Sequence, residues 1–193
     1  LVLDPGEMWQ YTASSIAQDL GVAGPTIKLD FEGLAAGTIV SNQFAGVTIS
    51  ADGKSTNGNA AMIFDSANPT GGDTDLATPG YGLNNNKAEN KILIISEDLD
   101  SNDPDDDARG GTITFEFDNP VTIQSISLLD VDSDENGGSV VTFTLADGSQ
   151  VFNIPALGDN SAQTLDLNVA NVVKMEVKLK SSGAITELCY NET

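Results

Sequence analysis

An acidic segment between Glu97 and Asp107 offers the clearest chemistry in this sequence. It holds seven carboxylates and no basic residue. Two unit charges about 4 Å apart repel by about 4 kcal/mol at an effective dielectric of 20, so a folded loop of this kind needs either solvent screening or a bound cation. We expect a cation, with a solvated acidic loop as the alternative. The candidate ligands in this segment are Glu97, Asp98, Asp100, Asp103, Asp105, Asp106 and Asp107.

The available donor atoms favour calcium over other metals. The chain contains no His and only one Cys, Cys189, so carboxylate, amide and carbonyl oxygens are the main ligands it can supply. A hard cation that takes roughly six to eight oxygens, Ca²⁺, suits such a set. The lack of His also removes Ser-His and Cys-His catalysis and any His-bound metal. A single Cys forms no internal disulfide, and we expect Cys189 to be a small buried apolar residue.

Two further acidic segments follow other apolar runs. The loop 68–82 is rich in Gly and Pro and carries Asp73 and Asp75, whose spacing places both carboxylates on one side of an extended chain. Asp65 ends the apolar run before this loop, and Asp130 and Asp132 end another apolar run. If the strands that precede the acidic segments run in the same direction, their acids converge at one rim of a sheet. The sequence therefore predicts several calcium ions at such a rim.

A structural calcium ion is a further possibility near the chain ends. Glu32 follows the first apolar run of the domain, and Glu187 lies in the last one. If the terminal strands pair, these two carboxylates meet. The alternative is that both are ordinary exposed acids.

Composition bounds the partners of the protein. The chain has 193 residues, with 29 acidic and 8 basic side chains and a formal charge of −21. Nucleic acids and anionic lipids both require a basic surface, so neither is an expected partner, and no apolar run is long enough to cross a membrane. Three short segments (65–75, 97–107 and 130–135) hold 14 of the 29 acids. This clustering favours ion sites over general acidity.

The pattern of apolar residues predicts an all-β protein. Short alternating runs are separated by turn signals such as Asp147-Gly148, which predicts a hairpin. Many short strands of this kind indicate an antiparallel β-sandwich of jelly-roll type with little helix. The predicted strands are 27–31, 47–51, 61–65, 92–96, 112–117, 125–130, 139–145, 150–154, 164–167, 172–180 and 184–190.

Two regions are expected along the chain. Residues 1–24 form a leader, which is either the edge of a preceding extracellular β-domain or an added strand. Residues 25–193 form the calcium-binding domain. Because the chain starts at Leu1 without a signal peptide, we expect an excised fragment of a longer protein, monomeric by itself.

Three segments together resemble a known module. They are the loop from Phe64 to Gly80, the strand and its end Ile92-Leu93-Ile94-Ile95-Ser96-Glu97-Asp98, and the run 110–115. Over about residues 27–190 the chain resembles the calcium-dependent peptide-binding domain of giant repeats-in-toxin (RTX) bacterial adhesins. The resemblance implies several bound Ca²⁺ ions, a ligand that is the C-terminus of a peptide on a host or neighbour cell, and a place on the bacterial surface in a longer secreted adhesin.

Such a ligand could be held through the ion itself. An exposed Ca²⁺ with an open coordination position binds a terminal carboxylate, which a protein of charge −21 would otherwise repel. Asp73, Asp75 and Asp98 are the expected ligands of that ion. Arg109 offers a bidentate donor to the peptide, or else a counter-charge to the acidic loop. Tyr81 either closes over the ligand or packs against its own loop.

Three other functions compete with peptide binding. A calcium-dependent carbohydrate-binding (lectin-like) module has the same fold, but the only Trp, Trp9, lies in the leader and the Tyr residues are scattered. A glycosidase needs an isolated pair of carboxyl groups in a cleft, which nothing in the sequence marks, so we do not expect an enzyme. A calcium-stiffened spacer would be shorter and would lack the long loop rich in Gly and Pro.

Overall fold

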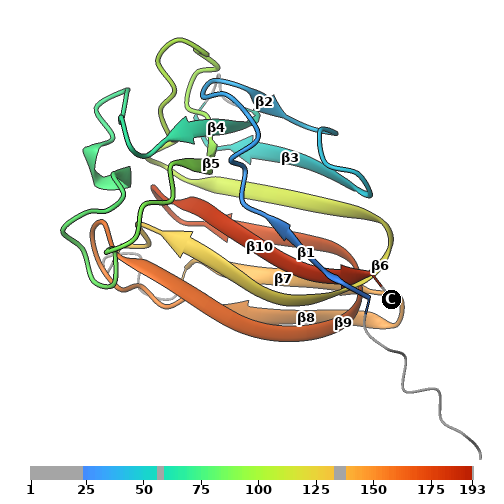
Figure 1. Ribbon diagram of the computed structural model, residues 1–193. Coiled ribbons are helices and arrows are strands. Elements are labelled where there is room, and N and C mark those ends of the chain that lie inside the picture. The colour runs from blue at the N-terminus through green and yellow to red at the C-terminus, as the bar shows by residue number, and fades with distance from the viewer. Residues whose placement is uncertain (1–23, 56–58, 133–137, 193) are drawn as a thin grey trace, which may run out of the picture.

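The protein is an antiparallel β-sandwich of jelly-roll type (Figure 1), as the sequence predicts. The computed structural model describes residues 24–55, 59–132 and 138–192. In these ranges the helical content is a single 3-10 turn, η1 (Thr74–Leu76). The strands are β1 (Thr26–Leu29), β2 (Ile39–Val40), β3 (Val47–Gly53), β4 (Ala61–Asp65), β5 (Lys91–Ile95), β6 (Gly111–Leu129), β7 (Val140–Leu145), β8 (Gly148–Asn153), β9 (Ala162–Leu179) and β10 (Ala184–Glu192).

Two long strands belong to both layers of the sandwich. The first half of β6 pairs with β3 and with the end of β9, whereas its second half pairs with β10 and with the start of β9. One layer therefore contains β2, β4, β5, β10 and β1, and the other contains β3, β7 and β8. The β7–β8 hairpin forms around Asp147, as predicted.

The sequence pattern was wrong about the middle of both long strands. It predicted a turn at 118–120 and separate strands on either side, but β6 continues through this segment. The ladder between β6 and β9 shifts register between Glu116 and Val121, and Asn168 and Asn171 of β9 have positive φ. Pro120 lacks a backbone N–H, so it suits a bulge where the ladder is interrupted. The residues that signal a turn thus produce a bend that carries each strand from one layer to the other.

The main core lies between the two layers. The alternating residues Ile113 and Phe115 of β6 and Met175 and Val177 of β9 are fully buried, and Phe117 is 8 % exposed. These are inward-facing positions that the period-two pattern predicts. The opposite layer contributes residues of the same kind, among them Ile63, Leu93, Ile126, Ile185 and Leu188.

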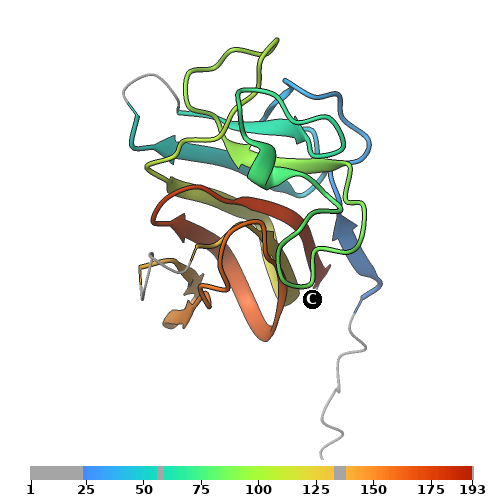
Figure 2. The ribbon, with the colours of Figure 1, turned by 90° about the vertical axis from the view of Figure 1, so that its left-hand side faces the viewer.

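A second, smaller core lies on the outer face of β4 and β5. It explains why the apolar run from Ile92 to Ile95 does not alternate, since these residues are buried on both faces of the sheet. The long loop 66–90 covers this face and inserts Leu76 of η1 into the core; Figure 2 looks onto this loop, drawn in green. The loop is thereby fixed to the sheet at the residue next to Asp75. The members of this core are Met62, Phe64, Leu76, Ile92, Ile94, Leu129 and Ala184.

Strand direction decides which acids share a rim. Both β5 and the second half of β6 are antiparallel to β10, so they run in the same direction, and Glu97 and Asp130 follow them at the same rim. The prediction of convergence is wrong for Asp65. Because β4 is antiparallel to β5, Asp65 lies at the opposite end, where its Oδ2 is 3.1 Å from Nζ of Lys91.

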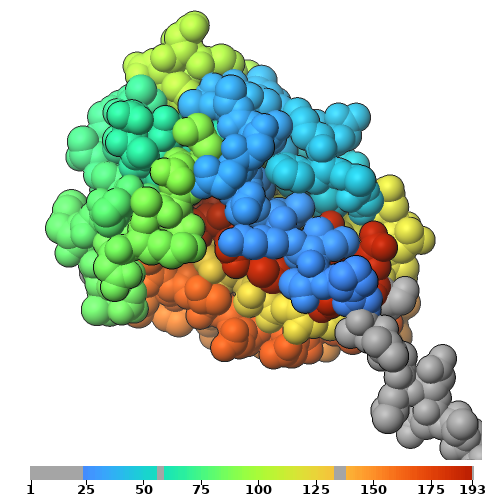
Figure 3. Space-filling model, in the orientation of Figure 1, coloured from blue at the N-terminus to red at the C-terminus, as the bar shows by residue number. Residues whose placement is uncertain are grey.

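The first and last strands of the described residues pair, as the sequence suggested. β1 pairs with β10 in the register Thr26↔Asn191, and Figure 3 shows β1, in blue, lying beside β10, in red. The leader predicted for residues 1–24 lies outside the described residues except for Gly24. Among the described residues, no helix has the length and apolar character needed to cross a membrane.

Candidate metal centre

The acidic loop after β5 folds back on its own base. An isolated β-bridge joins Ser96 to Asp106, and the N–H of Asp107 donates to the carbonyl of Ile95 at 2.8 Å. The N–H of Leu99 donates to Oγ of Ser96 at 3.0 Å, which ties down the tip. The two legs of the loop are therefore adjacent.

The loop after β4 contacts this acidic loop. The N–H of Asp106 donates to Oδ2 of Asp73 at 2.8 Å, and the N–H of Gly71 donates to Oδ1 of Asp103 at 2.8 Å. Gly71 has φ +64°, and a Cβ there would overlap the side chain of Asp105. Only glycine allows this approach without strain. Asp73, Asp105 and Asp106 form the first acidic group.

The carboxylates of the first acidic group lie too close together for all of them to ionise freely. Asp106 is 5 % exposed, and burial followed by the charge of Asp73 raises its pKa well above the ordinary value. Burial and the neighbouring charges of Asp75 and Glu97 raise the pKa of Asp73 to about 6. Burial, together with Asp98 and other acids, raises the pKa of Asp105 to about 6. A bound cation would remove this repulsion.

A second acidic group lies beside the first. One carboxylate oxygen from each of Asp75, Asp130 and Asp159 lies within 4.8 Å of the others. Asp130 is fully buried and has φ +61°, a conformation that costs energy for a non-glycine residue but is tolerated best by Asp and Asn. Burial, and the charges of Asp75 and Asp132, raise the pKa of Asp130 to about 7.

The turn before β10 joins the two groups. Oγ of Ser182 donates to Oδ2 of Asp130 at 2.9 Å, and the N–H of Gly183 donates to Oδ2 of Asp106 at 2.9 Å. On the other side, the N–H of Asn160 donates to Oδ1 of Asp130 at 2.6 Å. Both buried carboxylates are therefore oriented by donors from the scaffold.

Two carboxylate oxygens at this rim lack a partner. Oδ1 of Asp75 and Oδ1 of Asp105 are shielded from solvent and have no hydrogen bond within the described part of the chain. A buried acceptor left in this state is costly. An oxygen-seeking cation would satisfy both atoms, and no nitrogen or sulfur ligand from His or Cys belongs to either group, so the donor set fits Ca²⁺.

Most of the other predicted acids have structural partners. Asp107 accepts from the N–H and Oγ of Ser55 at 2.6 and 2.8 Å, which fixes the loop to the end of β3. Asp98 and Asp100 are exposed and accept from backbone N–H groups of their own loop. Glu97 is half-buried, and its charge raises the pKa of both Asp73 and Asp105.

The structure places the two acids of the expected terminal site against other groups. Oε2 of Glu187 is 2.5 Å from Nζ of Lys28, and Oε1 of Glu32 accepts from the N–H of Lys91 at 3.3 Å. Within the described ranges, neither belongs to the three-carboxylate group. The pairing of the terminal strands occurs, but Glu187 faces a lysine there.

Arg109 and Tyr81 differ in their relation to the rim. Arg109 is exposed, its backbone N–H donates to Asp107, and its guanidinium forms no ion pair with a carboxylate in the described part of the chain. Oη of Tyr81 donates to Oδ2 of Asp159 at 2.7 Å, although its side chain is 73 % exposed. Tyr81 therefore lies directly at the second acidic group.

Sequence reasoning missed three residues of the site. Asp159 and Asn160 are neighbours, and Ser182 lies in another loop; all three lie outside the acidic segments, so the clustering of acids does not mark them. The signal was the polar run Asp159-Asn160-Ser161 directly before a predicted strand, in a loop that begins at Pro155. Only the topology places that loop beside Asp75 and Asp130.

No protein-family model matches the chain, and a search of curated proteins also found no match. Among solved structures, the chain is similar to the F5/8 type C domain of a Bacteroides fragilis protein, with 11 % sequence identity and a TM-score of 0.35. The match covers 81 % of this chain and 97 % of that one. A likeness at this level carries no inference about ligand or mechanism.

Proposed function

We propose that this chain is a Ca²⁺-dependent binding module of a bacterial surface adhesin, which holds the C-terminal carboxylate of a peptide on a host or neighbour cell through bound calcium. The observation that carries the proposal is the group of Asp75, Asp130 and Asp159, in which Oδ1 of Asp75 is shielded from solvent and has no donor among the described residues. Such an arrangement is suited to a cation and is costly without one.

The exposure of the acidic side chains at this rim supports a site that is open to a ligand. Asp130 is fully buried, but Asp159 and Asp98 are exposed, so an ion at this rim would contact both the protein interior and solvent. Calcium accepts a variable set of six to eight oxygens, which leaves room for an external carboxylate. The ion also reverses the local charge that a protein of charge −21 presents to an anionic ligand.

The surface beside the ion suits a peptide. Tyr81 and Leu83 are 73 % and 57 % exposed, and Tyr81 is hydrogen-bonded to Asp159. Tyr is enriched among the residues that dominate the binding energy of protein interfaces. We assign to Tyr81 and Leu83 contact with the last side chains of the peptide, while the ion holds its terminal carboxylate.

The test compares one labelled peptide with a free C-terminus and with an amidated one. A phage-selected sequence serves as the peptide, and fluorescence polarisation measures its affinity at fixed calcium. Charged hydrogen-bonding groups contribute about 1.5–3 kcal/mol, so amidation should weaken binding by about 10–100-fold. Chelation of calcium should abolish binding of the acid form. Equal affinities of the two forms would exclude capture of the carboxylate.

A further inference from the structure

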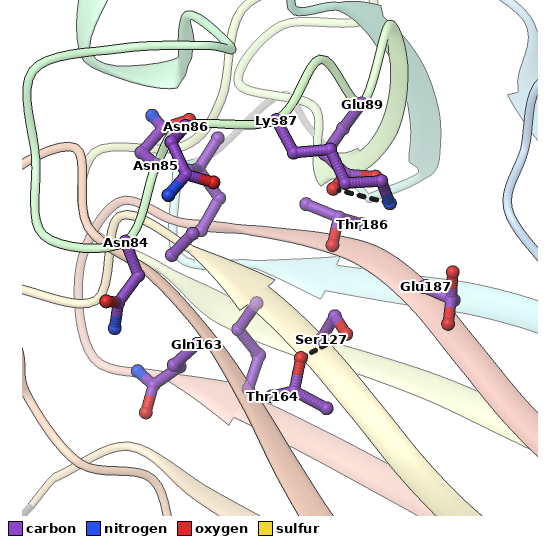
Figure 4. Close-up of a pocket in the computed structure, with 13 residues that line it drawn as sticks. Asn84, Asn85, Asn86, Lys87, Glu89, Ser127, Gln163, Thr164, Thr186 and Glu187 are labelled. Atoms are coloured by element: carbon purple, nitrogen blue, oxygen red, sulfur yellow. Dashed lines mark hydrogen bonds and ion pairs between the residues drawn. The ribbon is translucent and has the colours of Figure 1, made fainter.

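A pocket of about 420 Å³ lies apart from the acidic rim, on the outer face of the sheet. Strands β6, β9 and β10 form its floor, and the segment 84–89 of the long loop forms its wall (Figure 4). The volume falls in the range of small-molecule sites. None of the carboxylates of the two acidic groups lines it.

A β-bulge in β10 shapes the floor. Ile185 pairs with Leu128, and Glu187 pairs with the next residue of β6, Ser127, so Thr186 is an extra residue in its strand. Ile185 and Leu188 point into the main core, whereas Thr186 and Glu187, although consecutive, both line the pocket. A regular strand would alternate them between the faces. Bulges often re-aim side chains next to functional sites.

The wall of the pocket is anchored from behind. Asn85 is 3 % exposed, and its Nδ2 donates to the carbonyls of Ala77 and Asn160 at 2.9 and 3.0 Å. This fixed residue leaves its neighbours Asn84 and Asn86 to present their side chains at the pocket. Neither of these two side-chain amides has a hydrogen bond to the described part of the chain, so both retain their donors and acceptors for a ligand.

Charges in the pocket are balanced, in contrast to the acidic rim. Nζ of Lys87 lies 3.0 Å from Oε1 of Glu89, and Glu187 is paired with Lys28. The hydroxyls of Ser127 and Thr164 bond to each other at 2.8 Å on the floor, as the dashed lines in Figure 4 show. The pocket therefore offers amides, hydroxyls and two carboxylates that are each paired with a lysine.

We propose that this pocket binds a neutral saccharide unit, at a site separate from calcium. Adjacent hydroxyls of a sugar donate and accept at the same time, which matches amides beside hydroxyls and a carboxylate. The apolar part of the floor is small, because Leu128 and Leu129 are fully buried and Ala162 is the partly exposed apolar side chain that a C–H face of the ring could contact. A peptide anchor would need a larger apolar hollow than this floor provides.

The experiment titrates the calcium-loaded protein with methyl glycosides of glucose, galactose, mannose, fucose and N-acetylglucosamine and follows backbone amide signals by NMR. At least one glycoside should bind with a dissociation constant of about 1 mM or tighter, near −4.1 kcal/mol. Signal shifts should include the segment 84–89 and the bulge at Thr186. Absence of binding by all five glycosides at about 50 mM, well above that constant, would overturn the proposal.

Variants locate the binding. Two variants should each lower the affinity for the glycoside about tenfold, as loss of one hydrogen bond does. They are Asn86→Ala, at an exposed position, and Thr186→Val, which keeps the side-chain shape. Asn153→Ala removes an exposed amide on β8, outside the pocket, and should change nothing. Thermal melts check folding, and Asn86→Ala carries the conclusion if Thr186→Val does not fold. Glycoside binding that survives the pocket variants contradicts the proposal.

Two further measurements separate this site from the proposed calcium function. Asp75→Asn should lower the affinity for the peptide but leave the affinity for the glycoside unchanged. Asn86→Ala should lower the affinity for the glycoside but leave the affinity for the peptide unchanged. If Asp75→Asn abolishes glycoside binding, the sugar is held by the ion and the pocket assignment is wrong; if Asn86→Ala weakens the peptide, the pocket belongs to the peptide site and the assignment is again wrong.

Discussion

Asp73 accepts a 2.8 Å hydrogen bond from the backbone N–H of Asp106, a residue 33 positions further along the chain. This bond joins the loop that follows β4 to the loop that follows β5. It also brings together two carboxylates whose pKa values are both raised. Burial and the charge of Asp73 raise the pKa of Asp106, whereas burial and the charges of Asp75 and Glu97 raise the pKa of Asp73. A cation at this point would therefore connect two long loops and remove their repulsion at once, so the ion should act on stability as well as on binding.

We predict that calcium raises the melting temperature by more than about ten degrees. A ligand at 100 times its dissociation constant adds about 2.7 kcal/mol per site, and 1 kcal/mol shifts the melting temperature of a domain of this size by roughly 2–4 °C. With an ion at each acidic group, the sum exceeds ten degrees. Calorimetric melts in chelator and in millimolar Ca²⁺ measure the difference. Identical melting temperatures would remove the case for bound calcium.

Asp75→Asn should have opposite effects with and without the ion. Without calcium, the substitution removes a charge that repels Asp73 and Asp130, so the protein should become more stable. With saturating calcium, it removes a ligand, so the protein should become less stable and bind the ion about tenfold or more weakly. Melts and calcium titration calorimetry on the same samples reveal both effects.

A matched control for this substitution is Asp147→Asn, in the exposed hairpin between β7 and β8. It changes the net charge by the same amount but lies outside the acidic groups. Its melting temperature should shift little in either condition. If Asp75→Asn and Asp147→Asn behave alike, the effect is one of general charge and the assigned ligand is misplaced.

The alternation of side chains sufficed to predict the sandwich but not the path of its longest strands. A local period of two places Ile113, Phe115 and Phe117 of β6 on the buried face, and it does the same for Met175, Val177 and Leu179 of β9. Whether Pro120 begins a turn or a bend depends on tertiary pairing: β9 stays beside β6 on both sides of this point. Local sequence carries no information on that partner.

The candidate site could be predicted only in part for the same reason. Asp73, Asp75 and the acidic segment lie in two loops whose composition marks them in the sequence. Asp159 stands alone in its loop and reaches Asp75 only because β9 leaves the rim where β6 ends. In contrast, Asp65 ends an apolar run just as Asp130 does, but the direction of its strand places it at the opposite rim, away from the acidic groups.

Without calcium, stability should fall as the pH rises from about 5 to 8. Burial and nearby acids raise the pKa of Asp130 from 3.8 to about 7 and those of Asp73 and Asp105 to about 6. A raised carboxyl pKa means that the folded state binds more protons than the unfolded state between the two values, so the folded state is favoured at the acidic end of this window and loses that advantage toward pH 7.

Saturating calcium should reverse this trend, because the ion binds the ionised carboxylates and its affinity therefore grows with pH. Chemical denaturation at several pH values, in chelator and in calcium, gives the two slopes. Asp147→Asn should leave both slopes nearly unchanged. A calcium-free protein that gains stability up to pH 8 would show that these carboxyl groups are not strained by their neighbours.

The last prediction concerns Leu76, which fixes both Asp73 and Asp75 to the sheet. Leu76 is fully buried in the second core, and η1 holds it next to Asp75. Leu76→Ala should destabilise the protein by about 2–5 kcal/mol, as truncation of buried leucines does. It should also lower calcium affinity, because a loop released from the outer face of β4 and β5 must be ordered again when the ion binds.

Leu188→Ala separates the two effects. Leu188 is equally buried, but it lies on β10 in the main core and does not anchor the loop 66–90. Both variants should lose comparable stability in chelator, and only Leu76→Ala should lose calcium affinity, which titration calorimetry well below both melting temperatures measures. Equal calcium affinities in the two variants would mean that the acidic loops keep their ligand geometry without the second core, and that the hydrogen bond between Asp106 and Asp73 alone is enough to position them.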